Sequence, residues 1–178
     1  PRRFGKSLLV DTLKELFEGN RALFEGLAAE PRWDWSRRHP VVRISFADGV
    51  LRGRIELERR IRDQLRLARE ELGLPELTGP DPDDLPGQLA ELIRRAHRAA
   101  GQPVAVLVDE YDKPILDNLD DPAIAAEMRD GLRSLYSVLK GSDAHLKFVF
   151  LTGVSKFSKV SLFSGLNNLQ DLTLDPQF

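Results

Sequence analysis

Apolar residues along the chain follow two kinds of spacing, one typical of helices and one typical of buried strands. Helical spacing is found at residues 8–17, 55–72, 85–100 and 122–140. Strand-length runs rich in apolar and β-branched residues are found at 41–46, 104–110 and 146–152, and a last strand is expected to begin at 172–174. Because strands and helices alternate, this order predicts an α/β fold with a mainly parallel sheet.

Two segments depart from this pattern. The segment 73–87 is rich in Pro, Gly and Asp, which predicts a surface loop within a single domain over residues 1–178. Residues 20–39 contain Arg, Pro and four large apolar side chains, namely Phe24, Leu27, Trp33 and Trp35. Scattered aromatic residues are more typical of a core than of a nucleic-acid surface, which also needs a basic groove. Packing is therefore favoured there, with a nucleic-acid surface as the alternative.

Composition limits the classes of partner and ligand. The 178 residues include 26 basic and 28 acidic side chains, and a net charge of -2 gives no overall attraction to nucleic acid or a membrane surface. The absence of cysteine excludes disulfides and thiolate metal sites, and three scattered histidines lack ligand spacing, so a metal would need oxygen ligands. No apolar run approaches the ~18 residues of a membrane span. We expect a cytoplasmic protein without membrane contact.

The first seven residues, Pro-Arg-Arg-Phe-Gly-Lys-Ser, lead directly into the first predicted helix. A phosphate-binding P-loop, or Walker A motif, has Gly, any four residues, then Gly-Lys-Ser/Thr at a helix start. In this pattern Lys6 reaches the terminal phosphates, Ser7 ligates Mg²⁺, and Gly5 lets the backbone approach phosphate. The phosphate contacts are then expected from Arg3, Phe4, Gly5, Lys6, Ser7 and Leu8. Alone, the tripeptide is more typical of a polar helix N-terminus.

A second motif strengthens the nucleotide interpretation. Val104 to Val108 form an unbroken apolar run that is followed by Asp109 and Glu110. P-loop NTPases place a carboxylate after a hydrophobic strand, the Walker B motif, to hold Mg²⁺, which is the role expected of Asp109. Glu110 is expected to activate the water that attacks the γ-phosphate. The alternative is that two acidic residues simply leave a strand at the surface, and the preceding Gly-Lys-Ser favours the nucleotide interpretation.

Thr152 ends the predicted strand 146–152, where a hydroxyl could reach the γ-phosphate or the attacking water. A threonine before glycine is equally typical of an ordinary turn, and Ser155 would take this role if the register shifts. The following segment 154–169 is rich in Ser, Lys and Asn and is expected to form a loop.

Three stretches together resemble a known family. They are residues 1–7, residues 108–114 (Val-Asp-Glu-Tyr-Asp-Lys-Pro), and residues 150–158 running on to the Leu-Asn-Asn-Leu of 166–169. In this order they are similar to the AAA-ATPase-like proteins of bacteria and archaea, which often carry a C-terminal nuclease-like domain of the PD-(D/E)XK type. The resemblance implies a P-loop ATPase core with ATP and Mg²⁺ as ligands and Thr152 as a sensor residue.

The resemblance also implies parts that these residues do not contain. A three-layer P-loop sandwich would have a first strand before Pro1, a helical lid after Phe178 and, frequently, the nuclease-like domain. Nucleic acid would then be bound only through that domain, and a homo-oligomer is compatible with the family. An arginine finger cannot be assigned to these residues, so we expect the isolated chain to hydrolyse ATP slowly.

Three hypotheses of function follow. The first is an ATP-binding and ATP-hydrolysing module that switches an attached effector domain. The second is a regulatory module that binds nucleotide without catalysis. The third is a nucleic-acid-binding scaffold built on basic side chains and the two tryptophans, the basic residues being Arg32, Arg37, Arg38, Arg52 and Arg54. The balanced net charge counts against the third hypothesis.

Overall fold

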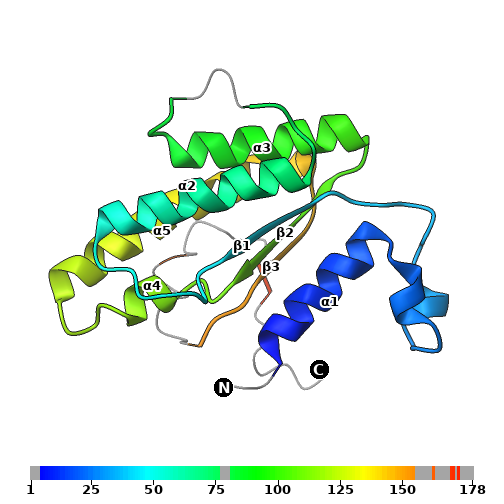
Figure 1. The fold of residues 1–178 in the computed structure, drawn as a ribbon, viewed down its shortest axis with the longest axis horizontal. Coiled ribbons are helices and arrows are strands. Elements are labelled where there is room, and N and C mark those ends of the chain that lie inside the picture. Colours follow the sequence, from blue (N-terminus) through cyan, green and yellow to red (C-terminus); the bar gives the residue numbers. More distant parts are fainter. Residues whose placement is uncertain (1–4, 77–80, 155–161, 163–168, 171, 173–178) are drawn as a thin grey trace.

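The chain folds into three layers around a parallel β-sheet, as seen in a computed structural model that describes residues 5–76, 81–154, 162, 169–170 and 172 (Figure 1). The strands β1 (Val41–Ser45), β2 (Val104–Asp109) and β3 (Leu146–Leu151) lie in the order β1-β2-β3. Helix α1 covers one face of the sheet, and α2, α3 and α5 cover the other. This arrangement confirms the predicted α/β class and a sandwich of the P-loop NTPase type.

The central strand is buried along its whole length. All six residues of β2 are buried, as expected for an apolar run in a parallel sheet that is covered on both faces. Its partners are in register, with Ser45 opposite Asp109 on one side and Leu151 opposite Val108 on the other. The three strands therefore end together, at the carboxyl edge of the sheet. In contrast, β3 is partly exposed, and Phe148 keeps 37% of its surface accessible.

The four predicted long helices are all present. They are α1 (Lys6–Glu18), α2 (Arg54–Glu71), α3 (Leu85–Ala100) and α5 (Pro122–Gly141). Gly19 ends α1 in the left-handed conformation that favours glycine, and Asp121 caps α5 by accepting hydrogen bonds from two first-turn amides. Within the described residues, no helix combines the length and the apolar character needed to cross a membrane.

The boundaries differ from the predictions in a few places. The predicted loop at 73–87 ends early, because Asp84 caps α3 by accepting from the Gly87 amide at 2.9 Å and residues 85–87 are already helical. Four short helical turns lie between these elements and were not predicted from the sequence, namely η1 (Arg21–Phe24), η2 (Glu30–Arg32), α4 (Lys113–Leu116) and η3 (Asp143–His145). Most of the predicted loop at 154–169 and of the predicted strand at 172–174 lies outside the described residues.

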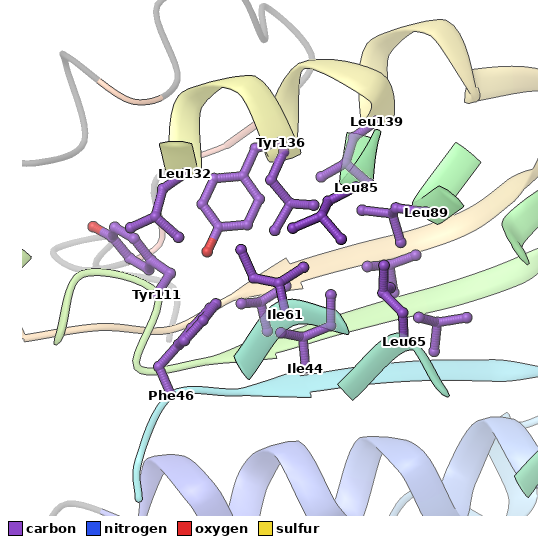
Figure 2. Close-up of a cluster of buried hydrophobic side chains, with 14 of the residues drawn as sticks. Ile44, Phe46, Ile61, Leu65, Leu85, Leu89, Tyr111, Leu132, Tyr136 and Leu139 are labelled. Carbon is purple, nitrogen blue, oxygen red and sulfur yellow. The ribbon is translucent and has the colours of Figure 1, made fainter. Parts of the chain in front are cut away.

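Two apolar cores stabilise the layers. The larger core lies between the sheet and helices α2, α3 and α5, where Ile44, Ile61, Leu89 and Tyr136 pack together (Figure 2). The smaller core lies between the sheet and α1, and it consists of Val10, Phe17, Val41, Ala105 and Leu107. Because alternate residues of β1 and β2 point to opposite faces, each strand contributes to both cores.

The aromatic residues of segment 20–39 pack against this framework. Trp33 lies edge-on to Phe17 with ring centroids 5.2 Å apart, and Trp35 lies 5.2 Å from Phe24. The indole nitrogen of Trp35 also donates to the Glu30 carbonyl at 2.7 Å. These contacts confirm the packing interpretation of the two tryptophans.

We predict that the larger core sets the stability of the chain. Leu92 on α3 is fully buried, so Leu92→Ala should lower the free energy of unfolding by about 2–5 kcal/mol. The matched control is Leu67→Ala on α2, where 47% of the side chain is exposed, and its effect should stay within about 0.5 kcal/mol. Urea unfolding followed by circular dichroism measures both, and equal effects would contradict the core assignment.

Candidate functional site

The two sequence motifs meet at the carboxyl edge of the sheet. The Ser7 hydroxyl, in the first turn of α1, donates a hydrogen bond of 2.6 Å to Asp109 Oδ2 at the end of β2, 102 residues later. Flanking backbone bonds fix this position, because Phe46 N donates to the Asp109 carbonyl at 3.1 Å and Thr152 N donates to the Val108 carbonyl at 2.9 Å. The carboxyl edge of a parallel sheet is where α/β proteins generally bind ligands.

The N-terminus of α1 is suited to an anion. Gly5 caps it with φ 73°, a left-handed conformation that favours glycine, and Leu9 N makes the first helical bond to the Gly5 carbonyl at 2.8 Å. Among the described residues, no side chain caps this end and no acidic residue lies in the first turn. Amides in a first helical turn have no intrahelical acceptor and lie at the positive end of the helix dipole. They are therefore available to phosphate oxygens.

Asp109 has one carboxylate oxygen without a partner. The residue is only 1% exposed, Oδ2 accepts from Ser7, and Oδ1 is buried without a hydrogen-bond donor in the described part of the chain. Such a buried polar atom is costly unless a ligand satisfies it. A hydroxyl and a carboxylate are the hard oxygen ligands that Mg²⁺ prefers, and Mg²⁺ commonly takes its other ligands from phosphates and water. The residues present thus fit this ion.

A metal ion held by protein side chains alone has no support in the described residues. They contain no group of three or more histidine, aspartate or glutamate side chains that could hold one. The oxygens of Ser7 and Asp109 would therefore need phosphate and water to complete a coordination shell.

Glu110 follows β2 in a strained conformation. Its φ of 52° is the single positive value among the described non-glycine residues. A left-handed backbone at such a residue costs about 1–3 kcal/mol and is found mainly where function requires it. Glu110 is half-buried, and its carbonyl accepts from Lys113 N at 3.1 Å. The strained turn directs the chain away from the strand immediately after Asp109.

Thr152 lies beside this turn. It is 7% exposed, and its backbone is bound on both sides, with its amide donating to Val108 and its carbonyl accepting from Tyr111 N at 3.0 Å. Lys6 is half-buried in the first turn of α1, and Leu8 in the same turn is 70% exposed. The predicted contacts Arg3 and Phe4, and the alternative residue Ser155, lie outside the described residues.

Asp112 and Gly153 form a contact that the sequence analysis did not predict. Asp112 is fully buried, and its two carboxylate oxygens lie 3.2 and 3.0 Å from the amide of Val154, which donates to them. A Cβ atom at Gly153 would lie 2.5 Å from Asp112 Oδ1 and 2.6 Å from Tyr111 Cε1. The sequence shows three nearby carboxylates after β2, but it carries no signal for which of them turns inward.

The short helix α4 fixes the loop that follows β1. Lys113 Nζ donates to the Gly49 carbonyl and pairs with Asp117 at 2.6 Å. Asn118, which is buried, donates from Nδ2 to the Leu51 carbonyl at 2.7 Å. The residues after β2 therefore hold the segments that follow both neighbouring strands.

Tyr136 on α5 is buried in the larger core near Tyr111 and Asp112. Its ring and that of Tyr111 lie on the side of the sheet that is covered by α2, α3 and α5 (Figure 2). Burial, followed by the nearby Tyr111 and Asp112, raises the pKa of the Tyr136 hydroxyl well above its usual range. The Tyr136 side chain therefore stays a neutral phenol.

A three-layer parallel sandwich whose first helix meets an acidic strand end belongs to the P-loop NTPase type. The chain belongs to the family described as predicted AAA-ATPase, whose family model matches residues 1–163. It is 59% identical over 178 residues to an "Uncharacterized protein in vnfD 5'region" of Azotobacter chroococcum mcd 1. The match covers 100% of this chain and 34% of that protein, so the chain spans about a third of its relative. No solved structure matches the chain.

We predict that Gly153 is needed for space and not for conformation. Gly153→Ala should lower the free energy of unfolding by about 1–3 kcal/mol, because the new methyl group would overlap Asp112 and Tyr111. The control Gly141→Ala, where a Cβ meets nothing within 4 Å, should stay within about 1 kcal/mol of the wild type. Thermal or urea unfolding measures both, and an unchanged Gly153→Ala protein would show that this packing is loose.

Proposed function

We propose that the chain is the nucleotide-binding core of an ATPase, with ATP and Mg²⁺ bound between the N-terminus of α1 and the carboxyl ends of β2 and β3. The observation that carries this proposal is the 2.6 Å hydrogen bond between Ser7 and Asp109, which joins the two motifs at one point. Membership of the predicted AAA-ATPase family supports it.

The proposed binding roles follow from the chemistry of each group. The first-turn amides of α1 donate to phosphate oxygens, and Lys6 adds a positive charge beside the terminal phosphates. Ser7 Oγ and Asp109 Oδ1, which has no partner in the described part of the chain, supply oxygen ligands for Mg²⁺. When bound, Mg²⁺ neutralises phosphate charge and orients the phosphates. Gly5 keeps the backbone open at this point, because a side chain there would have to adopt φ 73°.

Glu110 is proposed as the general base. It follows the Mg²⁺ ligand Asp109 directly, and its left-handed backbone gives its side chain a direction that a continued strand would not. Its carboxylate accepts a proton from the attacking water as that water approaches the γ-phosphate. Thr152, whose backbone is bound to Val108 and Tyr111, is proposed to sense the γ-phosphate with its hydroxyl.

We further propose that this core acts within a longer protein. The outer edge of β3 has no paired strand among the described residues, and its side chains are partly exposed, which suits the additional strand expected before the P-loop. The Azotobacter chroococcum relative is about three times as long as this chain. The ATPase cycle is then proposed to switch an effector located elsewhere in the full-length protein.

The nucleic-acid scaffold hypothesis gains little from the structure. Figure 1 places residues 30–38 and residues 52–54 at opposite ends of the molecule, so these arginines do not form one stripe. Arg37 pairs with Asp34 at 3.4 Å, and Arg54 pairs with Glu58. Both tryptophans are used in packing. A stacking groove would need these rings to be available to bases.

We predict that Lys6→Ala weakens ATP binding by about 10- to 100-fold, since a hydrogen bond to a charged group contributes about 1.5–3 kcal/mol. The matched control is Lys14→Ala on the same helix, where Lys14 pairs with Glu18 at 3.4 Å. This control should bind ATP like the wild type. Titration of the full-length protein with a fluorescent ATP analogue and Mg²⁺ measures both, and equal affinities of the two variants would remove the proposed site.

We predict that Glu110→Gln lowers the ATPase rate of the full-length protein by about 10²- to 10⁴-fold, the range typical of a lost general base. ATP affinity should be preserved, because glutamine keeps the size of the side chain. Glu127→Gln on the exposed surface of α5 is the control and should be fully active. Unchanged turnover in Glu110→Gln would instead favour the non-catalytic nucleotide switch.

A further inference from the structure

We propose that Asp112 is a positioning residue that holds Thr152 in place beside Asp109 and Glu110. This inference rests on the proposed ATPase function, because it assigns a task to a residue that does not itself contact ATP. The carboxylate of Asp112 would act through the backbone of residues 152–154. Its own side chain lies in the interior and is fully buried.

Asp112 lies just beyond the point where the regular pairing of β2 and β3 ends. The last paired residues of β2 and β3 are Val108 and Leu151. Beyond them the backbone of Thr152 is still bound twice, to the Val108 carbonyl at 2.9 Å and to Tyr111 N at 3.0 Å. The turn at Glu110 has by then carried the β2 chain away from the strand direction. Backbone acceptors from β2 are therefore no longer available to the next amides of the β3 chain.

The Asp112 carboxylate replaces the backbone acceptor that the β2 chain no longer offers. The amide of Val154 donates to it, with distances of 3.2 Å to Oδ1 and 3.0 Å to Oδ2. A hydrogen bond from an amide to a charged acceptor is stronger than one to a carbonyl. The β3 chain is thus held against the turn after β2 for three residues beyond the strand, and Thr152 is the first of them.

The Asp112 carboxylate does not have an ordinary helix-capping role. Asp112 stands at the N-cap position of α4, where an aspartate commonly accepts from the amides of its own helix. No such bond is made, and the carboxylate instead contacts a residue 42 positions away. Gly153 supports this contact, because a Cβ there would lie 2.5 Å from Asp112 Oδ1. The close approach requires glycine beside the aspartate.

The Asp112 contact affects how precisely the Thr152 hydroxyl is positioned. A displacement of about 1 Å in a group that contacts reacting atoms can lower a rate by about 10²-fold. Residues 152–154 follow the partly exposed strand β3, and without the Asp112 contact their remaining hydrogen bonds to described residues would be the two backbone bonds of Thr152. Asp112 therefore sets where the Thr152 hydroxyl lies relative to the γ-phosphate.

The test uses the full-length protein and measures kcat and ATP affinity separately. Asp112→Ala is expected to lower kcat about 10- to 100-fold and to leave ATP affinity within about twofold, because Lys6, Ser7 and Asp109 are untouched. Asp112→Asn keeps one acceptor oxygen for the Val154 amide and is expected to recover most of the lost rate. The exposed Asp120→Ala is the control and should match the wild type.

A double-mutant cycle separates positioning from general support of the fold. If Asp112 acts through Thr152, the variant with both Asp112→Ala and Thr152→Ala should have the kcat of Thr152→Ala alone. If the double variant instead loses kcat by the product of the two single-variant factors, the proposal is overturned. Gly153→Ala provides a second route should Asp112→Ala fail to fold, since it displaces the same contact and should show the same non-additivity with Thr152→Ala.

The outcomes also distinguish this inference from the function on which it rests. If the wild type shows no Glu110-dependent turnover, the proposed ATPase function is wrong and the role of Asp112 is wrong with it. If turnover depends on Glu110 but Asp112→Ala and Gly153→Ala keep the wild-type kcat, or multiply with Thr152→Ala, only the positioning role is overturned.

Discussion

The hydrogen bond between Ser7 Oγ and Asp109 Oδ2 is the contact on which the arrangement of the site depends. It joins the first turn of α1 to the last residue of a strand that is buried on every side. Val10 and Phe17 anchor the same helix in the smaller core, so the position of Ser7 is set by packing and not by this bond alone. A rigid sheet thereby orients a helix N-terminus, and the positive end of that helix lies beside a carboxylate.

Burial divides the three carboxylates after β2 into different tasks. Asp109 and Asp112 are 1% and 0% exposed, whereas Glu110 between them is half-buried. The left-handed turn at Glu110 makes this division possible, because a continued strand would send alternate side chains to opposite faces. Asp109 therefore faces α1, Asp112 faces the segment after β3, and Glu110 retains access to solvent. Local strain of about 1–3 kcal/mol is offset by the hydrogen bonds that surround the turn.

Much of the fold could be predicted from sequence, because it rests on periodic burial. The apolar run 104–108 indicated a buried strand, and Gly19 and Asp121 mark helix ends through their local chemistry. The meeting of Ser7 and Asp109 was also predictable, since both residues belong to known spacings. The roles of Asp112, Lys113 and Asn118 were not. Each bonds to backbone groups more than 40 residues away, and such partners depend on tertiary register, which a single sequence does not carry.

Segment 110–118 links these observations, because it contacts the chain on both sides of the central strand. Asp112 holds the residues after β3, while Lys113 and Asn118 hold the Gly49 and Leu51 carbonyls after β1. A shift of the Glu110 turn would therefore move both flanking loops together, because one short segment carries the contacts to both. These bonds connect the carboxyl end of β2 to the loop that follows β1.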